Sequence, residues 1–211
     1  MTEIHVGQAG LRRDLATYAR RFDLLELGAE PGTLPRRSRL RGWKAEVPAG
    51  FVFSLRLPRS LSRWPDAGAP AELREALGNA EALGAAWLLL STPPEVTPCQ
   101  RTRRRLAALV AELPRERWQI AWEPRGLWED RQEEELAAEL GVVLVRDLRR
   151  RPAPPGKVVY TRLLALGASA RQSEAALERV AERIAGYAGA FIVVEGSGAL
   201  GVRDYLRPPE P

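Results

Sequence analysis

The sequence has few of the residues that bind transition metals or form disulfides. Its 211 residues include one cysteine (Cys99), one histidine (His5) and one methionine. A single cysteine permits no internal disulfide and fits a reducing compartment. A site built from several histidine and cysteine ligands is not expected, and neither is a bound cofactor. We interpret His5 as a histidine satisfied within the core rather than as a metal ligand.

Long apolar runs are also missing. No stretch approaches the roughly 18 apolar residues that a membrane-spanning helix needs. The N-terminus shows no basic region followed by an apolar core, so a secretory signal is not predicted. We therefore expect a cytoplasmic protein without a membrane partner.

Lysine is nearly absent, although the chain is basic. The net charge is +5, and all but two of the 32 lysines and arginines are arginine. Arginines cluster at 36–41, 101–105 and 149–151. Clustered guanidiniums suit phosphates, so nucleic-acid binding is one alternative. The clusters lack the interleaved aromatic residues that stack on bases, and solvated helix faces and loop caps are the other interpretation.

What the chain does have is a regular alternation of strand and helix patterns. The strands are predicted at 3–7, 23–28, 51–57, 86–91, 118–123, 142–147, 157–163 and 190–195, and the first helix at about 11–20. Alternation of this kind predicts parallel strands with helical crossovers. The fold class is therefore α/β, a TIM-barrel-like parallel barrel with room for one irregular unit. We expect a single domain over residues 1–206 and a disordered tail over 207–211.

Charged residues recur at the C-terminal ends of these strands, where α/β barrels bind their ligands. Barrel-facing parity selects six of them, and a seventh follows in the loop after the fifth strand. Because burying an unpaired charge costs several kcal/mol, we predict an alternating ring of carboxylates and guanidiniums at the barrel mouth. The seven residues are Glu26, Arg56, Glu123, Arg125, Asp147, Arg162 and Glu195.

The ring predicts a pocket for a small molecule that is anionic or polyhydroxylated. Arg56, Arg125 and Arg162 would hold the ligand through bidentate contacts, with Asp147 and Glu195 also binding it. Glu26 and Glu123 would supply acid and base chemistry, in a hydrolase or lyase.

Two other interpretations of the charged residues stay open. A salt-bridge network that closes the barrel without catalysis needs no ligand. A magnesium or manganese site made by Glu26, Glu123 and Asp147 is the other, although no metal is our first expectation. The sequence leaves open whether the chain is an enzyme.

A glycine-rich segment, GSGALG at 196–201, follows the last strand and opens a short helix. Phosphate-binding loops have this arrangement, and in TIM barrels they often follow the seventh and eighth strands. A flexible turn onto the last helix is the alternative.

Several motifs resemble the DUF72 family. They are RLRGWKAEVPAGFVFSLRLPRS at 39–60, IHVGQAG at 4–10, LLEL at 24–27, EPRGLW at 123–128 and YTRL at 160–163. The resemblance implies a TIM-barrel-like fold, but it does not imply a reaction, because the family's activity is not established. It also implies polar residues at 26, 56, 123, 125 and 162, with lysine usual at the position of Arg56.

The chain departs from the family pattern at several polar positions. An asparagine position after the second strand is Gly28, and a histidine position in the EPRGLW motif is Gly126. Two further histidine positions are Arg63 and Leu164. These losses remove candidate proton shuttles and ligands. They indicate a trimmed, divergent member and weaken the interpretation as an enzyme, with binding without catalysis as one alternative.

Overall fold

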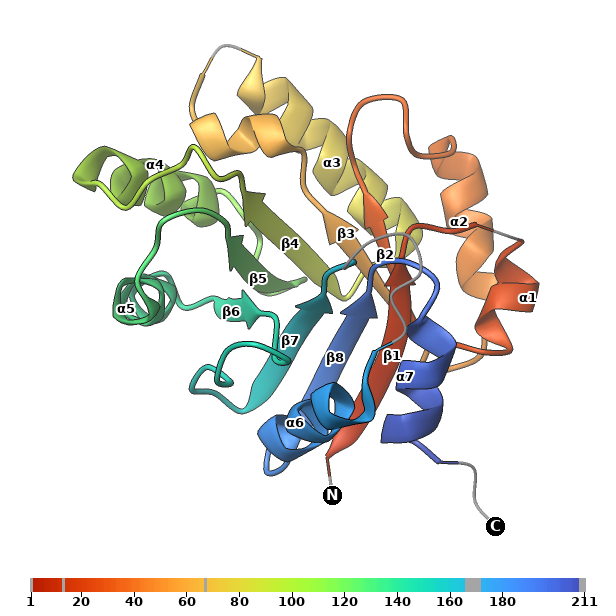
Figure 1. Cartoon of the computed structure of the whole chain (residues 1–211). Helices are drawn as coiled ribbons and strands as arrows, with labels where there is room; N and C mark the ends of the chain where they lie inside the picture. Colours follow the sequence, from red (N-terminus) through yellow and green to blue (C-terminus); the bar gives the residue numbers. More distant parts are fainter. Residues whose placement is uncertain (1, 13, 67, 166–171, 209–211) are drawn as a thin grey trace. The chain divides into compact units, whose positions relative to one another are not determined.

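The structure, a computed structural model, describes residues 2–12, 14–66, 68–165 and 172–208. It confirms the predicted fold class. Eight parallel strands form a closed barrel in sequence order (Figure 1). The strands are β1 (Glu3–Ala9), β2 (Leu24–Gly28), β3 (Val52–Arg56), β4 (Trp87–Thr92), β5 (Gln119–Pro124), β6 (Val143–Arg146), β7 (Val158–Leu163) and β8 (Gly189–Val194). Each predicted strand is present within two residues of its predicted ends.

Helices alternate with these strands along most of the chain. They are α1 (Leu15–Ala19), α2 (Arg37–Glu46), α3 (Ala69–Leu83), α4 (Gln100–Ala111), α5 (Asp130–Leu140), α6 (Glu174–Ile184) and α7 (Ala199–Leu206), with a 3₁₀ helix at Arg59–Arg63. Helix α1 is shorter than predicted, because Asp14 caps it: its Oδ1 accepts a hydrogen bond from the Thr17 amide at 2.8 Å. Within the described part of the chain, no helix has the length and apolar character to cross a bilayer.

The chain divides into two compact units. Unit 1 comprises Met1–Glu26, Glu46–Val52 and Val145–Pro211, and unit 2 comprises Leu27–Ala45 and Phe53–Leu144. This division does not test the predicted single domain over residues 1–206, which therefore stays a prediction.

In unit 1, three full-length strands lie side by side. Strand β8 pairs with β1 on one edge and with β7 on the other, and β1 pairs with the start of β2 through Gly7 and Leu24. Helix α7 lies beside β1 in Figure 1, and α1 lies further out on the same side. The strand positions in the core are apolar on both faces, as parallel strands covered by helices require: Val6, Ile192 and Val193 are fully buried.

In unit 2, β4 pairs with β3 and β5, and β5 pairs with β6. Two tryptophans, Trp87 and Trp122, are fully buried here. The Trp122 indole N–H donates to Thr92 Oγ1 at 3.3 Å, and its ring packs edge-on against Trp128. Phe53 stacks on Trp43 of α2. The aromatic residues thus hold the helices on the strands.

The sixth unit of the barrel is the irregular one. Residues 147–157, all described, connect β6 to β7 without a helix. Their sequence, DLRRRPAPPGK, contains three prolines, which cannot continue a helix. Helix α6 supports this connection instead: Arg183 donates to the carbonyls of Leu148 and Arg151 at 2.6 and 2.8 Å.

The predicted tail begins inside the described residues. Arg207 donates to Asp23 Oδ2 at 2.5 Å, so the chain is still attached to unit 1 at this point. Residues 209–211 lie outside the described residues, and their disorder stays a prediction.

Candidate functional site

Unit 1 contains a buried cluster of charged side chains at the C-terminal ends of β2, β7 and β8. Arg162 donates from Nε to Glu26 Oε2 at 3.1 Å, and its Nη2 lies 3.1 Å from Glu26 Oε1. The same Nη2 donates to Glu195 Oε1 at 2.8 Å. Tyr160 O–H donates to Glu26 Oε2 at 3.0 Å. One guanidinium therefore bridges two carboxylates, as the predicted alternation requires within this unit.

The members of this cluster differ in their access to solvent. The side chains of Glu26 and Arg162 are each 1% exposed, whereas that of Glu195 is 30% exposed. Burial of Glu26 and Arg162 is tolerable because the pair is bidentate and Tyr160 adds a further donor. Of the two carboxylates, Glu195 is the one that the cluster presents to the solvent.

Sequence parity explains this geometry. Tyr160 and Arg162 are two residues apart on β7, so they point to the same face of the strand. Glu26 near the end of β2 meets both of them. Sequence analysis missed Tyr160, although its shared parity with Arg162 was a signal that could have found it.

Unit 2 has a second cluster at the ends of β4 and β5. Arg125 donates to Glu123 from Nε at 3.2 Å and from Nη2 at 3.3 Å. Ser91 Oγ donates to Glu123 Oε2 at 2.6 Å, a partner that sequence analysis also missed. The Glu123 side chain is 8% exposed and that of Arg125 is 30% exposed. This cluster therefore buries its carboxylate and presents its guanidinium.

Arg56 lies against the backbone of Gly28 in unit 2. A Cβ added to Gly28 would come within 3.1 Å of Arg56 Nη2, and the Arg56 carbonyl accepts from the Ala29 amide at 2.8 Å. A larger side chain at position 28 would therefore displace the guanidinium. The glycine that replaces the family's asparagine makes room for an arginine where lysine is usual.

Gly126 has a similar explanation. Its φ is +102°, and a Cβ there would lie 2.4 Å from the Pro94 carbonyl oxygen. The loop after Glu123 and Arg125 can have this conformation only with glycine. The histidine of the family pattern is thus incompatible with this path of the chain.

Asp147 does not lie with either cluster in any contact described. It pairs with Arg149, which donates from Nε to Asp147 Oδ1 at 2.8 Å and from Nη2 to Oδ2. Arg149 also donates to Gln172 and to the Leu164 carbonyl. Asp147 thus orients the arginine that holds the helix-free connection between β6 and β7.

The predicted ring combines residues of both units. Unit 1 brings together Glu26, Arg162 and Glu195, and unit 2 brings together Glu123 and Arg125. The predicted pairing of Glu123 with Arg56 or Arg162, and the closure of a single ring, stay predictions. Each carboxylate of the alternative magnesium site is paired with an arginine. Among the described residues, no group of three or more His, Cys, Asp or Glu side chains is placed to hold a metal ion.

His5 lies in a separate polar group near the N-terminal ends of the strands in unit 1. Its Nδ1 is 3.3 Å from Asp23 and its Nε2 is 3.2 Å from Glu3, and its ring stacks on Phe191. The hydrogen bond with Asp23 raises the His5 pKa above its ordinary value of 6.5, although burial opposes the shift. His5 is thus a buried histidine that lies within ion-pair distance of two carboxylates.

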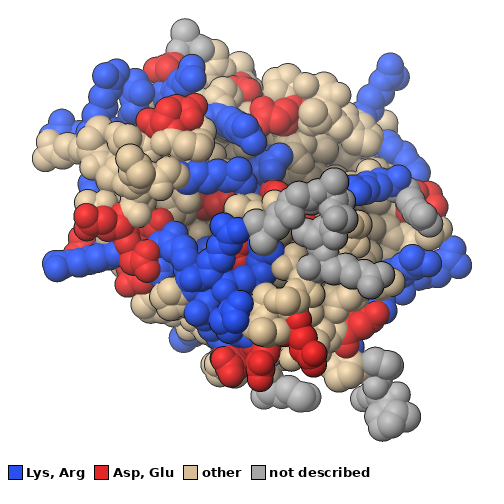
Figure 2. Space-filling view, viewed as in Figure 1, with Lys and Arg blue, Asp and Glu red and all other residues tan. Residues whose placement is uncertain are grey.

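Some arginines of the three sequence clusters make hydrogen bonds within the fold. One arginine of each cluster donates to a neighbouring side chain: Arg37 to Asn79, Arg105 to Asp66 and Arg149 to Asp147. Figure 2 shows basic side chains on the face in view with acidic side chains interspersed among them. These contacts favour helix faces and loop caps over a continuous basic surface.

Together the strands and these two clusters define a parallel α/β barrel with paired carboxylates and guanidiniums at its strand ends. The chain belongs to DUF72, described as a protein family of unknown function, whose model matches residues 6–197. No curated protein matches the chain.

Solved structures support the fold. A DUF72 family protein from Thermotoga maritima MSB8 is 15% identical, with 96% of this chain and 97% of that one covered at a TM-score of 0.73. One from Enterococcus faecalis V583 is 16% identical, with 98% and 97% covered at 0.72. A xylose isomerase domain containing protein from Salmonella typhimurium LT2 is 15% identical, with 90% and 86% covered at 0.64. At these identities the likeness establishes the fold alone.

Proposed function

We propose that the chain binds a polyhydroxylated small molecule, of the sugar or sugar-acid class, at the C-terminal ends of β7 and β8. The observation that carries this proposal is the bridge from buried Glu26 through Arg162 to the part-exposed Glu195. A carboxylate held by a buried guanidinium keeps its position without a ligand. It can therefore accept hydrogen bonds from hydroxyl groups with little loss of side-chain entropy.

The negative charge of Glu195 favours contact with hydroxyl groups of a ligand over contact with an anionic group. The Glu195 carboxylate reaches solvent, and a phosphate placed against it would be repelled. An anionic group of the ligand would have to lie away from this carboxylate. One structural relative is described as containing a xylose isomerase domain, and xylose is itself polyhydroxylated. That likeness agrees with the proposed ligand class.

This proposal changes the acid and base roles that the sequence predicted for Glu26 and Glu123. Glu26 is 1% exposed and is bonded to both Arg162 and Tyr160, so we assign it the role of a positioning residue. Within the cluster of unit 1, Glu195 is the carboxylate that reaches solvent. If the chain is a hydrolase or lyase, Glu195 is the group that would exchange a proton with the ligand. Binding without catalysis remains part of the proposal.

Calorimetric titration of neutral monosaccharides, sugar acids and sugar phosphates tests the proposal. We expect a neutral sugar or polyol to bind, and E195Q to weaken binding about tenfold, because a charged acceptor is lost. E178Q is the matched control: Glu178 is an exposed carboxylate on α6 of the same unit. Equal loss in both variants, or binding that E195Q leaves unchanged, would contradict the proposal.

The alternative of nucleic-acid binding predicts a different response. Affinity for an oligonucleotide would fall steeply with salt, because bound cations are released from the phosphates. Sugar binding through Glu195 would depend only weakly on salt. A third alternative, a scaffold without a ligand, predicts neither response.

A further inference from the structure

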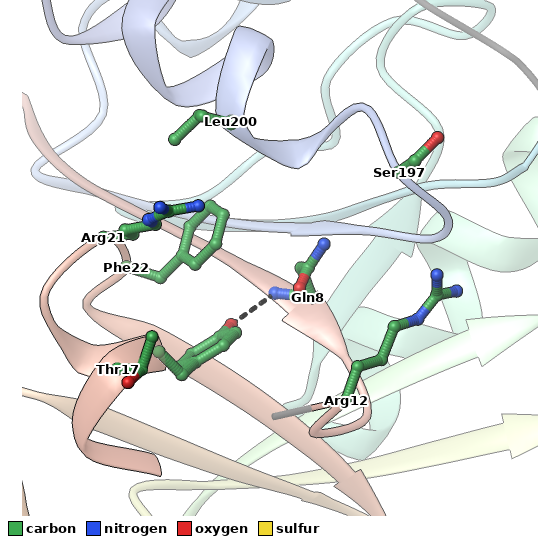
Figure 3. Close-up of a pocket in the computed structure, with 8 residues that line it drawn as sticks. Gln8, Arg12, Thr17, Arg21, Phe22, Ser197 and Leu200 are labelled. Atoms are coloured by element: carbon green, nitrogen blue, oxygen red, sulfur yellow. Dashed lines mark hydrogen bonds between the residues drawn. The ribbon is translucent and has the colours of Figure 1, made fainter. Parts of the chain in front are cut away.

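Unit 1 has a cavity that the proposed sugar site does not use. It has a volume of about 270 Å³ and lies between α1 and α7 beside the C-terminal end of β1 (Figure 3). Its lining comes from β1, α1, the segments that follow them and the start of α7: Gln8, Arg12, Thr17, Tyr18, Arg21, Phe22, Ser197 and Leu200. The cavity is large enough for a small organic molecule.

The lining is basic and contains no carboxylate. Arg12 and Arg21 are both exposed, and among the described residues neither guanidinium has a hydrogen-bond or ion-pair partner. The neighbouring hollow on the other side of Arg21 differs, because Asp23 and Asp204 line it together with its arginines. The cavity beside β1 therefore has uncompensated positive charge, which favours an anion.

One part of the cavity is apolar. Phe22 and Tyr18 form a buried wall, and Leu200 on α7 is a large hydrophobic side chain that remains 38% exposed. In Figure 3, Phe22 and Leu200 are drawn toward one end with Arg21 beside Phe22, Arg12 and Ser197 toward the other, and Gln8 between them. A ligand that matches this lining has an anionic group and an apolar group.

The polar floor of the cavity is fixed in place. The Gln8 amide N–H donates to Tyr18 Oη at 2.7 Å, the bond drawn in Figure 3, and Tyr18 O–H donates to the Leu24 carbonyl at 2.6 Å. The Gln8 side chain donates from Nε2 to the Gly196 carbonyl at 3.2 Å. These bonds hold the GSGALG segment against β1, so the cavity exists before a ligand binds.

We propose that this cavity binds a small organic anion that carries an apolar group. Its phosphate or carboxylate lies toward Arg12 and Ser197, and its apolar group packs against Phe22 and Leu200. Glu195 does not line this cavity, and the cavity binds an anion rather than a neutral hydroxylated molecule.

Titration with phenyl phosphate and with inorganic phosphate, each at constant ionic strength, tests the proposal by calorimetry or ³¹P NMR. We expect phenyl phosphate to bind at least about tenfold more tightly than phosphate, because its ring buries apolar surface. R12Q should weaken both probes about tenfold. L200A should remove most of the advantage of phenyl phosphate and leave phosphate binding unchanged.

R20Q is the matched control, because Arg20 ends α1 beside Arg21 but does not line this cavity. It should change either affinity by less than about twofold, as a distant screened charge does. An equal loss in R20Q and R12Q would show diffuse attraction by surface charge and would overturn the proposal. So would phenyl phosphate binding that survives both R12Q and L200A, or no binding of either probe at millimolar concentration.

The two proposed sites can fail independently. E195Q should leave phenyl phosphate binding intact, and R12Q should leave neutral sugar binding intact. Loss of phenyl phosphate binding in E195Q but not in R12Q would place the anion at the strand ends and overturn the assignment to this cavity.

Discussion

The two charged clusters are built from the same residue types with opposite polarity. In unit 1 the guanidinium of Arg162 is buried and the carboxylate of Glu195 reaches solvent. In unit 2 the carboxylate of Glu123 is buried and the guanidinium of Arg125 reaches solvent. The same sequence pattern at a strand end can therefore present either charge to a ligand. Which charge is presented depends on the loop: Arg125 follows Pro124 out of the strand, whereas Arg162 stays within β7.

The largest expected difference between the clusters is in stability. R162M leaves Glu26 buried beside Tyr160 without its bidentate partner, and we expect a loss of about 3–5 kcal/mol in the free energy of unfolding. R125M also removes a partner of a buried carboxylate, Glu123, but Ser91 still donates to it and Arg125 itself is part-exposed, so we expect a smaller loss of about 1–2 kcal/mol. Urea unfolding of both variants measures the two values. Equal losses would mean that the two arginines are equally structural, and the comparison would fail.

The buried carboxylate of unit 2 gives the next largest effect. E123Q keeps the shape of the side chain but removes the charge that Arg125 and Ser91 meet, so we expect a loss of about 1–3 kcal/mol. The fold should survive, because Arg125 can be solvated. Circular dichroism and urea unfolding of E123Q check both statements. Unfolding of this variant at room temperature would show that Glu123 is as critical as Glu26.

The pH dependence of stability distinguishes the contribution of the His5 group from those of the two charged clusters. Because the His5 pKa is raised in the folded protein, protonated His5 stabilises the fold. That contribution is full below the ordinary value of 6.5 and is lost as the pH rises through the folded pKa. The Asp23 pKa is lowered by His5, the Val6 amide and Arg207, against the effect of burial, so its contribution is lost as the pH falls through its folded value.

The measurement is direct because His5 is the one histidine of the chain. Its imidazole NMR signals should titrate above pH 6.5, and the unfolding free energy should fall over the same range. H5Q should remove this pH dependence, while R125M should retain it. A His5 that titrates below 6.5 would contradict the assigned pairing with Asp23.

The smallest effects come from the hydroxyl groups that support each buried carboxylate. Y160F removes the donor to Glu26, and S91A removes the donor to Glu123. Each should cost about 1 kcal/mol, as a single hydrogen bond does. Urea unfolding resolves losses of this size. A loss above about 3 kcal/mol in Y160F would make Tyr160 a main support of the cluster.

The fold was readable from the sequence because strand alternation and helix stops repeat in every unit. The irregular sixth unit was also readable in outline, since the prolines between Arg151 and Gly156 exclude a helix. The start of α1 was wrong because the Asp14 cap outweighs the helical pattern that precedes it. Local hydrogen bonds of this kind are not visible in apolar periodicity.

The residues of the candidate site could be predicted from the sequence, but the contacts that each of them makes could not. Parity on the strands selected Glu26, Arg162 and Glu195, which the structure brings together. Parity could not show that Asp147 pairs with Arg149, because that contact is made within an irregular turn. Nor could the alternation along the strands show the relative exposure of Glu26 and Glu195, of which only Glu195 reaches solvent.

The most direct test of the account is the NMR response of unit 1 to a neutral sugar. We predict that the Arg162 Nε–H signal and the Glu195 and Gly196 amide signals shift on addition of neutral monosaccharides, and that acetate at equal concentration leaves them unchanged. If acetate shifts these signals while no neutral sugar or polyol does, Glu195 is not the contact for a hydroxyl-bearing ligand, and the central claim is contradicted.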